Sequence, residues 1–185
     1  MTTARAYLTA VADTYRELDA SLELRAPLAD EERDELLAPL GGRVPRWLVE
    51  LWQVADGGPS YSPAFARPGF FTGVDFLSLS QAVALRNRLR DLAGNFTGWQ
   101  EPTPRDGRIR PGWFPDSWVP FGAFGGSTIV LFADCDPAPG GEIGQVIAYV
   151  HDPDQISLLA PDGEAFLAAS LEWFREHAEE FVPEE

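Results

Sequence analysis

Hydrophobic residues recur at helical spacing in several segments of the chain. Apolar positions three and four residues apart predict amphipathic helices over residues 3–22, 45–55, 81–93 and 162–181. A shorter and more polar helix is predicted over residues 30–37. Asp30, Ser80 and Asp162 stand where a side chain can cap the first turn of a helix.

Short apolar runs bounded by Gly, Pro or Asp lie between these segments and are typical of β-strands. They cover residues 70–71, 74–77, 118–121, 128–133, 143–150 and 155–159, whereas residues 59–69 have the composition of a loop. The last four runs follow one another too closely for parallel crossovers, so antiparallel pairing is expected. The order of elements predicts an α+β fold, with helices packed against one mostly antiparallel sheet.

The chain length favours a single domain. We expect residues 1–38 to form an N-terminal helical extension packed on a main domain of residues 39–185. Residues 94–112 are rich in Gly and Pro and show no hydrophobic period, so they are expected to form a long exposed loop. Loops of this length are uncommon and are often functional or mobile.

The formal net charge of −15 is distributed unevenly. Residues 1–85 carry −5, residues 86–110 carry +3, and residues 111–185 carry −13. An acidic surface of this kind keeps a protein soluble, and it also attracts a basic protein partner. The basic segment, residues 86–110, includes Phe96 and Trp99. It is more compatible with an acidic contact, within the chain or with a partner, than with nucleic acid, because phosphate binding needs a larger cationic surface.

Composition excludes several classes of protein. The chain has no lysine, which removes Schiff-base chemistry and the lysine of a phosphate-binding loop. No apolar run reaches the ~18 residues of a membrane span, and the first residues lack the apolar stretch of a signal peptide. A cytoplasmic protein that contacts neither membrane nor nucleic acid is therefore expected.

Candidate catalytic groups are few, and we predict no catalytic residues and no cofactor. Cys135 is the single cysteine, and its acidic neighbours oppose a thiolate. Asp134, Asp136 and His151 suggest a metal-dependent hydrolase as an alternative. However, a simple hairpin places the two aspartates at one end of a strand and His151 at the other end.

The order of several landmarks resembles the SUKH superfamily, which includes a yeast cell-wall assembly regulator and many bacterial toxin-immunity proteins. The resemblance begins at residues 44–48 (Val-Pro-Arg-Trp-Leu) and 55–58 (Ala-Asp-Gly-Gly). It continues through residues 118–122 (Trp-Val-Pro-Phe-Gly) and the Gly-rich segment 136–147, and it ends in the closing helix at Phe166-Leu167. The long loop and the extra N-terminal helix depart from the family pattern.

The resemblance implies an α+β fold and action by protein binding rather than catalysis. We therefore expect a cytoplasmic immunity protein whose partner is a protein, plausibly a basic toxin domain. An intracellular adaptor or regulatory domain is the alternative. The expected partner-binding rim consists of Trp113, Asp116, Trp118, Asp134, Asp136, Glu142 and His151. The sequence leaves the partner's identity and the oligomeric state open.

Overall fold

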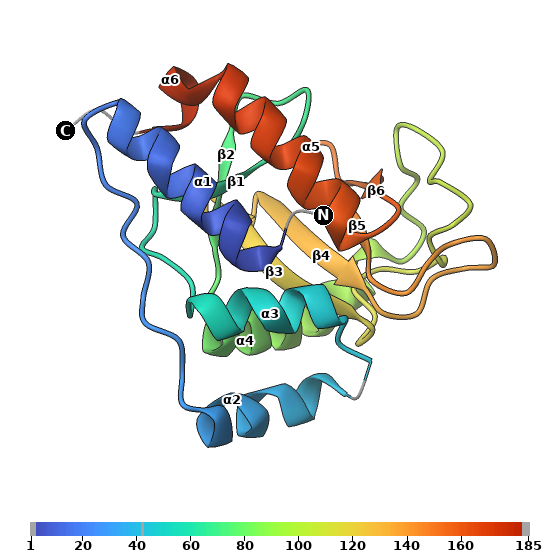
Figure 1. Ribbon diagram of the computed structural model, residues 1–185. Coiled ribbons are helices and arrows are strands. Elements are labelled where there is room, and N and C mark those ends of the chain that lie inside the picture. Colours follow the sequence, from blue (N-terminus) through green and yellow to red (C-terminus); the bar gives the residue numbers. More distant parts are fainter. Residues whose placement is uncertain (1–2, 42, 183–185) are drawn as a thin grey trace.

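Six strands form one antiparallel sheet in which neighbours in sequence are also neighbours in space (Figure 1). The computed structural model describes residues 3–41 and 43–182. The strands are β1 (Pro63–Ala66), β2 (Gly73–Phe76), β3 (Trp118–Phe124), β4 (Ile129–Asp134), β5 (Gln145–Val150) and β6 (Gln155–Ala160). The predicted α+β fold with a mostly antiparallel sheet is confirmed.

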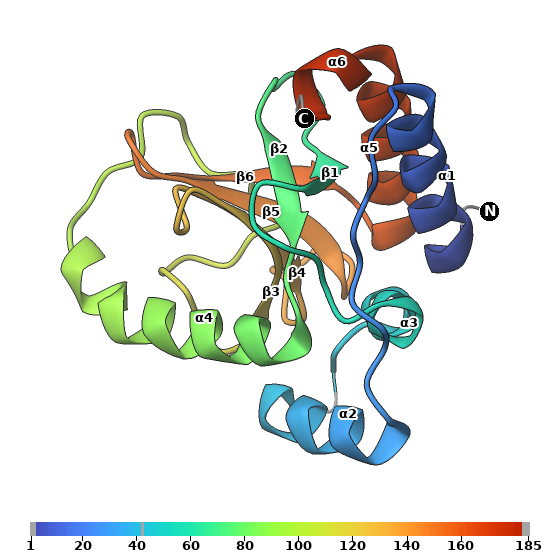
Figure 2. The same cartoon turned by 90° about the vertical axis from the view of Figure 1, so that its left-hand side faces the viewer.

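Helices and one long loop cover both faces of this sheet. The helices are α1 (Ala4–Glu17), α2 (Asp30–Leu37), α3 (Arg46–Val54), α4 (Leu79–Leu92), α5 (Gly163–Glu176) and α6 (Ala178–Phe181), with short 3₁₀ turns η1 (Ala38–Leu40) and η2 (Ala93–Phe96). Figure 2 shows α1 and α5 side by side on one side of the sheet and α4 on the other. Within the described residues, no helix is long and apolar enough to cross a membrane.

The central strands bury side chains on both faces. In β4, Leu131 packs into the core beneath α1, α3 and α5, whereas Val130 and Phe132 pack into a second core beneath α4. In β5, Ala148 and Tyr149 divide between the two cores in the same way. This alternation follows from the two-residue period of a strand, and it explains why these runs are apolar throughout instead of alternating with polar residues.

The free edge of β1 is closed by side chains from the helices. The hydroxyl of Tyr7 donates to the carbonyl of Ala64 at 2.8 Å, and that of Tyr15 donates to the carbonyl of Pro63 at 2.9 Å. Ser170 Oγ on α5 accepts the N–H of Ala66 at 2.9 Å. Because α1 supplies both tyrosines, it belongs to the same core as the sheet.

The segment 97–117 covers the second face of the sheet and the edge of β6. Ile109 and Phe114 are buried in the second core, with only 4% and 3% of their surface exposed. The loop predicted over residues 94–112 begins with η2, is irregular after it and is mostly exposed, but Ile109 within it is buried in the core. Sequence periodicity missed this role because the apolar residues of the loop are not spaced as in a helix or strand.

Some predicted boundaries differ from the structure. β1 lies within the predicted loop 59–69, while residues 70–71 lie in the turn before β2 instead of in a strand. Ser78, not Ser80, caps α4, through a capping box with Gln81. The predicted C-terminal helix is interrupted at His177 and continues as α6. Asp162 caps α5 as expected.

Candidate functional site

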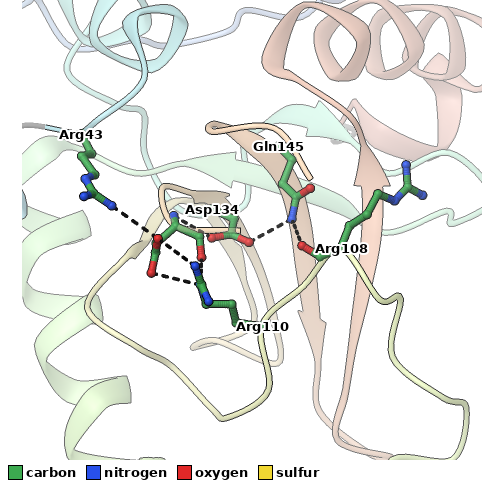
Figure 3. A network of polar contacts seen from close by, with 6 residues as sticks. Arg43, Arg108, Arg110, Asp134 and Gln145 are labelled. Atoms are coloured by element: carbon green, nitrogen blue, oxygen red, sulfur yellow. Dashed lines mark hydrogen bonds and ion pairs between the residues drawn. The ribbon is translucent and has the colours of Figure 1, made fainter. Parts of the chain in front are cut away.

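Asp134 lies at the end of β4, opposite Gln145 of β5, and is fully buried. One carboxylate oxygen accepts the side-chain amide of Gln145 at 2.9 Å, and the other accepts the N–H of Asp136 at 3.1 Å (Figure 3). The Gln145 amide also donates to the carbonyl of Arg108 at 3.0 Å. Burial raises the pKa of Asp134 above its usual range. Gln145, held in place by Asp134, therefore ties the segment 97–117 to the sheet from inside the protein.

Asp136 lies at the surface beside this network. Its carboxylate faces two guanidinium groups, with Arg43 Nη1 at 3.3 Å and Arg110 Nε at 3.1 Å (Figure 3). Arg110 Nε also donates to the carbonyl of Asp136 at 2.9 Å. The negative charge of Asp136 is thus largely neutralised by two arginines of the same chain.

Asp116 is neutralised in a similar way. One of its oxygens lies 3.5 Å from Arg86 and 3.7 Å from Arg90, both on α4. Arg86 also donates to the carbonyl of Pro39 at 2.7 Å. These contacts connect α4 to the end of segment 97–117 and to η1.

Trp113 and Trp118 surround a mostly buried ion pair. Arg105 Nε lies 2.8 Å from the carboxylate of Glu101, and each of these two side chains is only 12% exposed. The Arg105 guanidinium is 5.0 Å from the Trp113 ring and 5.8 Å from the Trp118 ring. Trp118 itself is 1% exposed, and Trp113 is half-buried. Both tryptophans therefore hold the loop in place.

Glu142 and His151 occupy different ends of the β4–β5 hairpin. Glu142 is exposed just before β5, whereas His151 follows β5 and pairs with Asp154 at 2.8 Å. Asp154 raises the pKa of His151 by a hydrogen bond and by its charge. The register pairs Asp134 with Gln145 and Ile129 with Val150, so His151 lies roughly 20 Å from the aspartates. This separation agrees with the hairpin prediction.

Metal-ligating and nucleophilic groups do not converge in the described part of the chain. No group of three His, Cys, Asp or Glu residues there is arranged to hold a metal ion. Cys135 is buried, and this burial raises the pKa of its thiol to about 12. The fraction of reactive thiolate at neutral pH is therefore very small.

A groove that the sequence analysis did not single out lies between α4 and the β2–β3 end of the sheet. We call it the Tyr61 groove; it is lined by residues 58–61, 75–77 and 123–127, together with Gln81, Ala84, Leu85 and Arg88 of α4. Its volume is about 470 Å³. Among its lining residues are Gly58, Gly125 and Gly126, which carry no pattern that marks a binding site in the sequence.

Two charged side chains line the Tyr61 groove. Both oxygens of Asp75 accept backbone N–H groups, from Tyr61 at 2.9 Å and from Ser62 at 3.0 Å. Burial raises the pKa of Asp75, and these hydrogen bonds oppose the shift. Arg88 is exposed and donates to Ser127 Oγ at 2.8 Å. Tyr61 is 71% exposed and its ring meets Phe124 edge-on at 6.5 Å.

Comparison with known proteins identifies one family. The model of the SMI1 / KNR4 family (SUKH-1) matches residues 27–169, which include the whole sheet and the first half of α5. No curated protein matches the chain.

Proposed function

The chain belongs to the SMI1/KNR4 (SUKH-1) family, and from this premise we propose that it is a non-enzymatic protein-binding module that acts as an immunity protein. It binds a cognate toxin domain in the cytoplasm and blocks its activity. The single observation that carries this proposal is the family match over residues 27–169, because the family consists of immunity and regulatory domains.

The chemistry of the described residues supports binding rather than catalysis. The buried Cys135 thiol has a raised pKa, and His151 is far from Asp134. The remaining acidic surface favours a basic partner, since residues 111–185 carry a charge of −13. Opposite charges bring partners together faster, with association rates up to ~10⁸ M⁻¹s⁻¹ at low salt.

The seven residues of the expected rim differ in position and exposure. Trp113 is half-buried beside Arg105, and His151 lies at the far end of the β4–β5 hairpin. Asp116, Asp136 and Glu142 reach the surface at or near the Asp134 end of the sheet and are proposed to face the partner. Glu142 supplies the attracting charge there, because Asp116 and Asp136 are already paired with arginines of this chain. Trp118 and Asp134 are buried, so they position the rim from beneath without contacting a partner.

The test is a growth assay in which this chain is co-expressed with the toxin domains encoded beside its gene. We expect it to restore growth against one of them and to bind the purified toxin. Glu142→Arg should weaken binding, and Glu32→Arg on α2, also an exposed acid, serves as a charge-matched control. If no neighbouring toxin is bound or neutralised, the immunity role is wrong and a regulatory role takes its place.

A further inference from the structure

The six arginines between residues 86 and 110 differ in how their charge is used. Five of them contact carboxylates of this chain: Arg86 and Arg90 with Asp116, Arg105 with Glu101, Arg108 with Asp106, and Arg110 with Asp136. Arg88 has no carboxylate partner within residues 3–41 and 43–182, and its one hydrogen bond goes to the hydroxyl of Ser127. Arg88 is thus the cation of the basic segment that is left for an external anion.

Arg88 belongs to the lining of the Tyr61 groove. The volume of this groove, about 470 Å³, lies within the range of ~300–1,000 Å³ that is usual for ligand sites. Leu85, Phe124 and Tyr61 contribute apolar side chains to the same lining. Ala84 on α4 contributes only a small side chain to the lining.

The second charged residue of the lining, Asp75, already accepts the backbone N–H groups of Tyr61 and Ser62. Its carboxylate repels a ligand carboxylate, whereas the guanidinium of Arg88 attracts one. The rings of Tyr61 and Phe124, which meet edge-on in the same lining, offer a surface for an apolar group.

From this arrangement we infer that the Tyr61 groove binds a segment of the protein partner in which an aliphatic or aromatic side chain lies next to an Asp or Glu. Arg88 holds the acidic side chain, and the apolar side chain rests on Tyr61 and Phe124. This inference rests on the proposed function, since it names the part of a protein partner that this surface contacts. The local positive charge of Arg88 complements an acid even though the chain as a whole attracts basic proteins.

The first experiment uses a phage-displayed library of random heptapeptides as the probe. On the wild-type chain we expect enrichment of peptides with Asp or Glu within two positions of an aliphatic or aromatic residue. Arg88→Glu should reverse the charge preference toward Arg and Lys. Arg175→Glu is the matched control, because Arg175 is also exposed and lies on α5, outside the groove lining. It should leave the selection unchanged.

The second experiment measures the most enriched peptide in solution by fluorescence anisotropy. We expect Arg88→Met to weaken binding at least ~10-fold, and replacement of the peptide's Glu by Gln to weaken it similarly. Combining the two changes should cost little more than either alone, which a double-mutant cycle detects. Thermal melting of each variant verifies that it is folded.

The outcomes separate this inference from the proposed function. No enrichment, enrichment without an acidic residue, or the same peptides from wild type and Arg88→Glu would overturn the inference. A toxin that is bound and neutralised equally well by wild type and Arg88→Glu would overturn it as well, while leaving the immunity role intact. If Arg88→Glu rescues growth less well than wild type while Arg175→Glu rescues it equally well, the result supports both the groove inference and the immunity role.

Discussion

The carboxylate of Glu101 accepts a hydrogen bond from the backbone N–H of Ile156 at 2.6 Å. Its second oxygen lies 2.8 Å from Arg105 Nε. The side chain of Glu101 therefore accepts a hydrogen bond from a backbone N–H on the outer edge of β6 and also anchors the segment 97–117. Unpaired strand edges are prone to pair with other chains, so this contact also protects the sheet.

Replacing Glu101 should destabilise the protein strongly. Glu101→Ala leaves Arg105 mostly buried without its carboxylate and the Ile156 N–H without an acceptor. We expect the free energy of unfolding to fall by about 3 kcal/mol, as for other broken buried ion pairs. Urea denaturation measures this change. Glu142→Ala, at an exposed position, should change it by less than about 0.5 kcal/mol. Equal effects of the two substitutions would contradict this interpretation of Glu101.

Truncating Phe114 tests whether segment 97–117 is part of the core. Phe114 is 3% exposed and packs against Trp118 and Tyr149, with ring centroids 6.4 Å and 5.1 Å away. Phe114→Ala should lower the free energy of unfolding by about 3–5 kcal/mol. Ile143→Ala, at a position 60% exposed, is the control and should have little effect. A small loss for Phe114→Ala would mean that the loop covers the sheet only loosely.

The buried Asp134 makes stability depend on pH. Its pKa is raised in the folded chain, so the folded state binds this proton more tightly than the unfolded state does. This favourable contribution is complete below the unfolded pKa, near 3.8, and is lost as the pH rises through the folded pKa. Relative to Asp134→Asn, the wild type should gain stability on acidification. Urea unfolding of both proteins from pH 7 to pH 3.5 measures the difference, and a constant difference would refute the prediction.

The titration of His151 should depend on Asp154. Asp154 raises the pKa of His151, mainly through a hydrogen bond to the ring nitrogen at 2.8 Å. The stabilisation that this raised pKa gives the folded state is present below the pKa of the unfolded histidine, near 6.5. It is lost as the pH rises through the pKa of His151 in the folded state. Asp154→Asn should return the pKa of His151 toward 6.5 in an NMR titration. An unchanged titration curve would rule out this pairing in solution.

Gly163 is expected to be intolerant of any side chain. It begins α5 directly against the indole of Trp47, where an added Cβ would lie 2.1 Å from a ring carbon. The Trp47 ring is itself held, edge-on to Phe121 and by a hydrogen bond to the carbonyl of Gly144. Gly163→Ala should cost about 1–3 kcal/mol despite the helix preference of alanine. Gly107→Ala is the control, because nothing lies within 4 Å of its added Cβ. Thermal unfolding compares the two.

The strands of the C-terminal meander were predictable because each is an apolar run bounded by turn residues. β1 was not, because its four residues lie between Ser62 and Arg67 and resemble the surrounding loop. It is a strand because Tyr7, Tyr15 and Ser170 bind its outer backbone groups. These partners are 48 to 104 residues away in sequence, beyond the reach of local periodicity.

The candidate site, like β1, depends on contacts between residues that are distant in sequence, so local patterns predict it only in part. The regional charge count identified the basic segment and favoured an acidic contact for it, and five of its arginines do contact acids of this chain. Which arginine remained without an acid could not be predicted, since it depends on which side chains meet. The Tyr61 groove was missed for the same reason, because its lining comes from four separate parts of the chain.

The sequence by itself determined the fold class, the antiparallel meander, the family and the acidic character. The fold class, the meander and the acidic character follow from hydrophobic period, turn residues and composition, which are local or additive along the chain. The family follows from the resemblance in the order of its sequence motifs. Only the tertiary structure decided that Asp134 and Trp118 are buried, that Ile109 and Phe114 of segment 97–117 pack into the core, and that Arg88 lines a groove. Burial and charge pairing depend on residues that are distant in sequence and adjacent in space, so no local pattern encodes them.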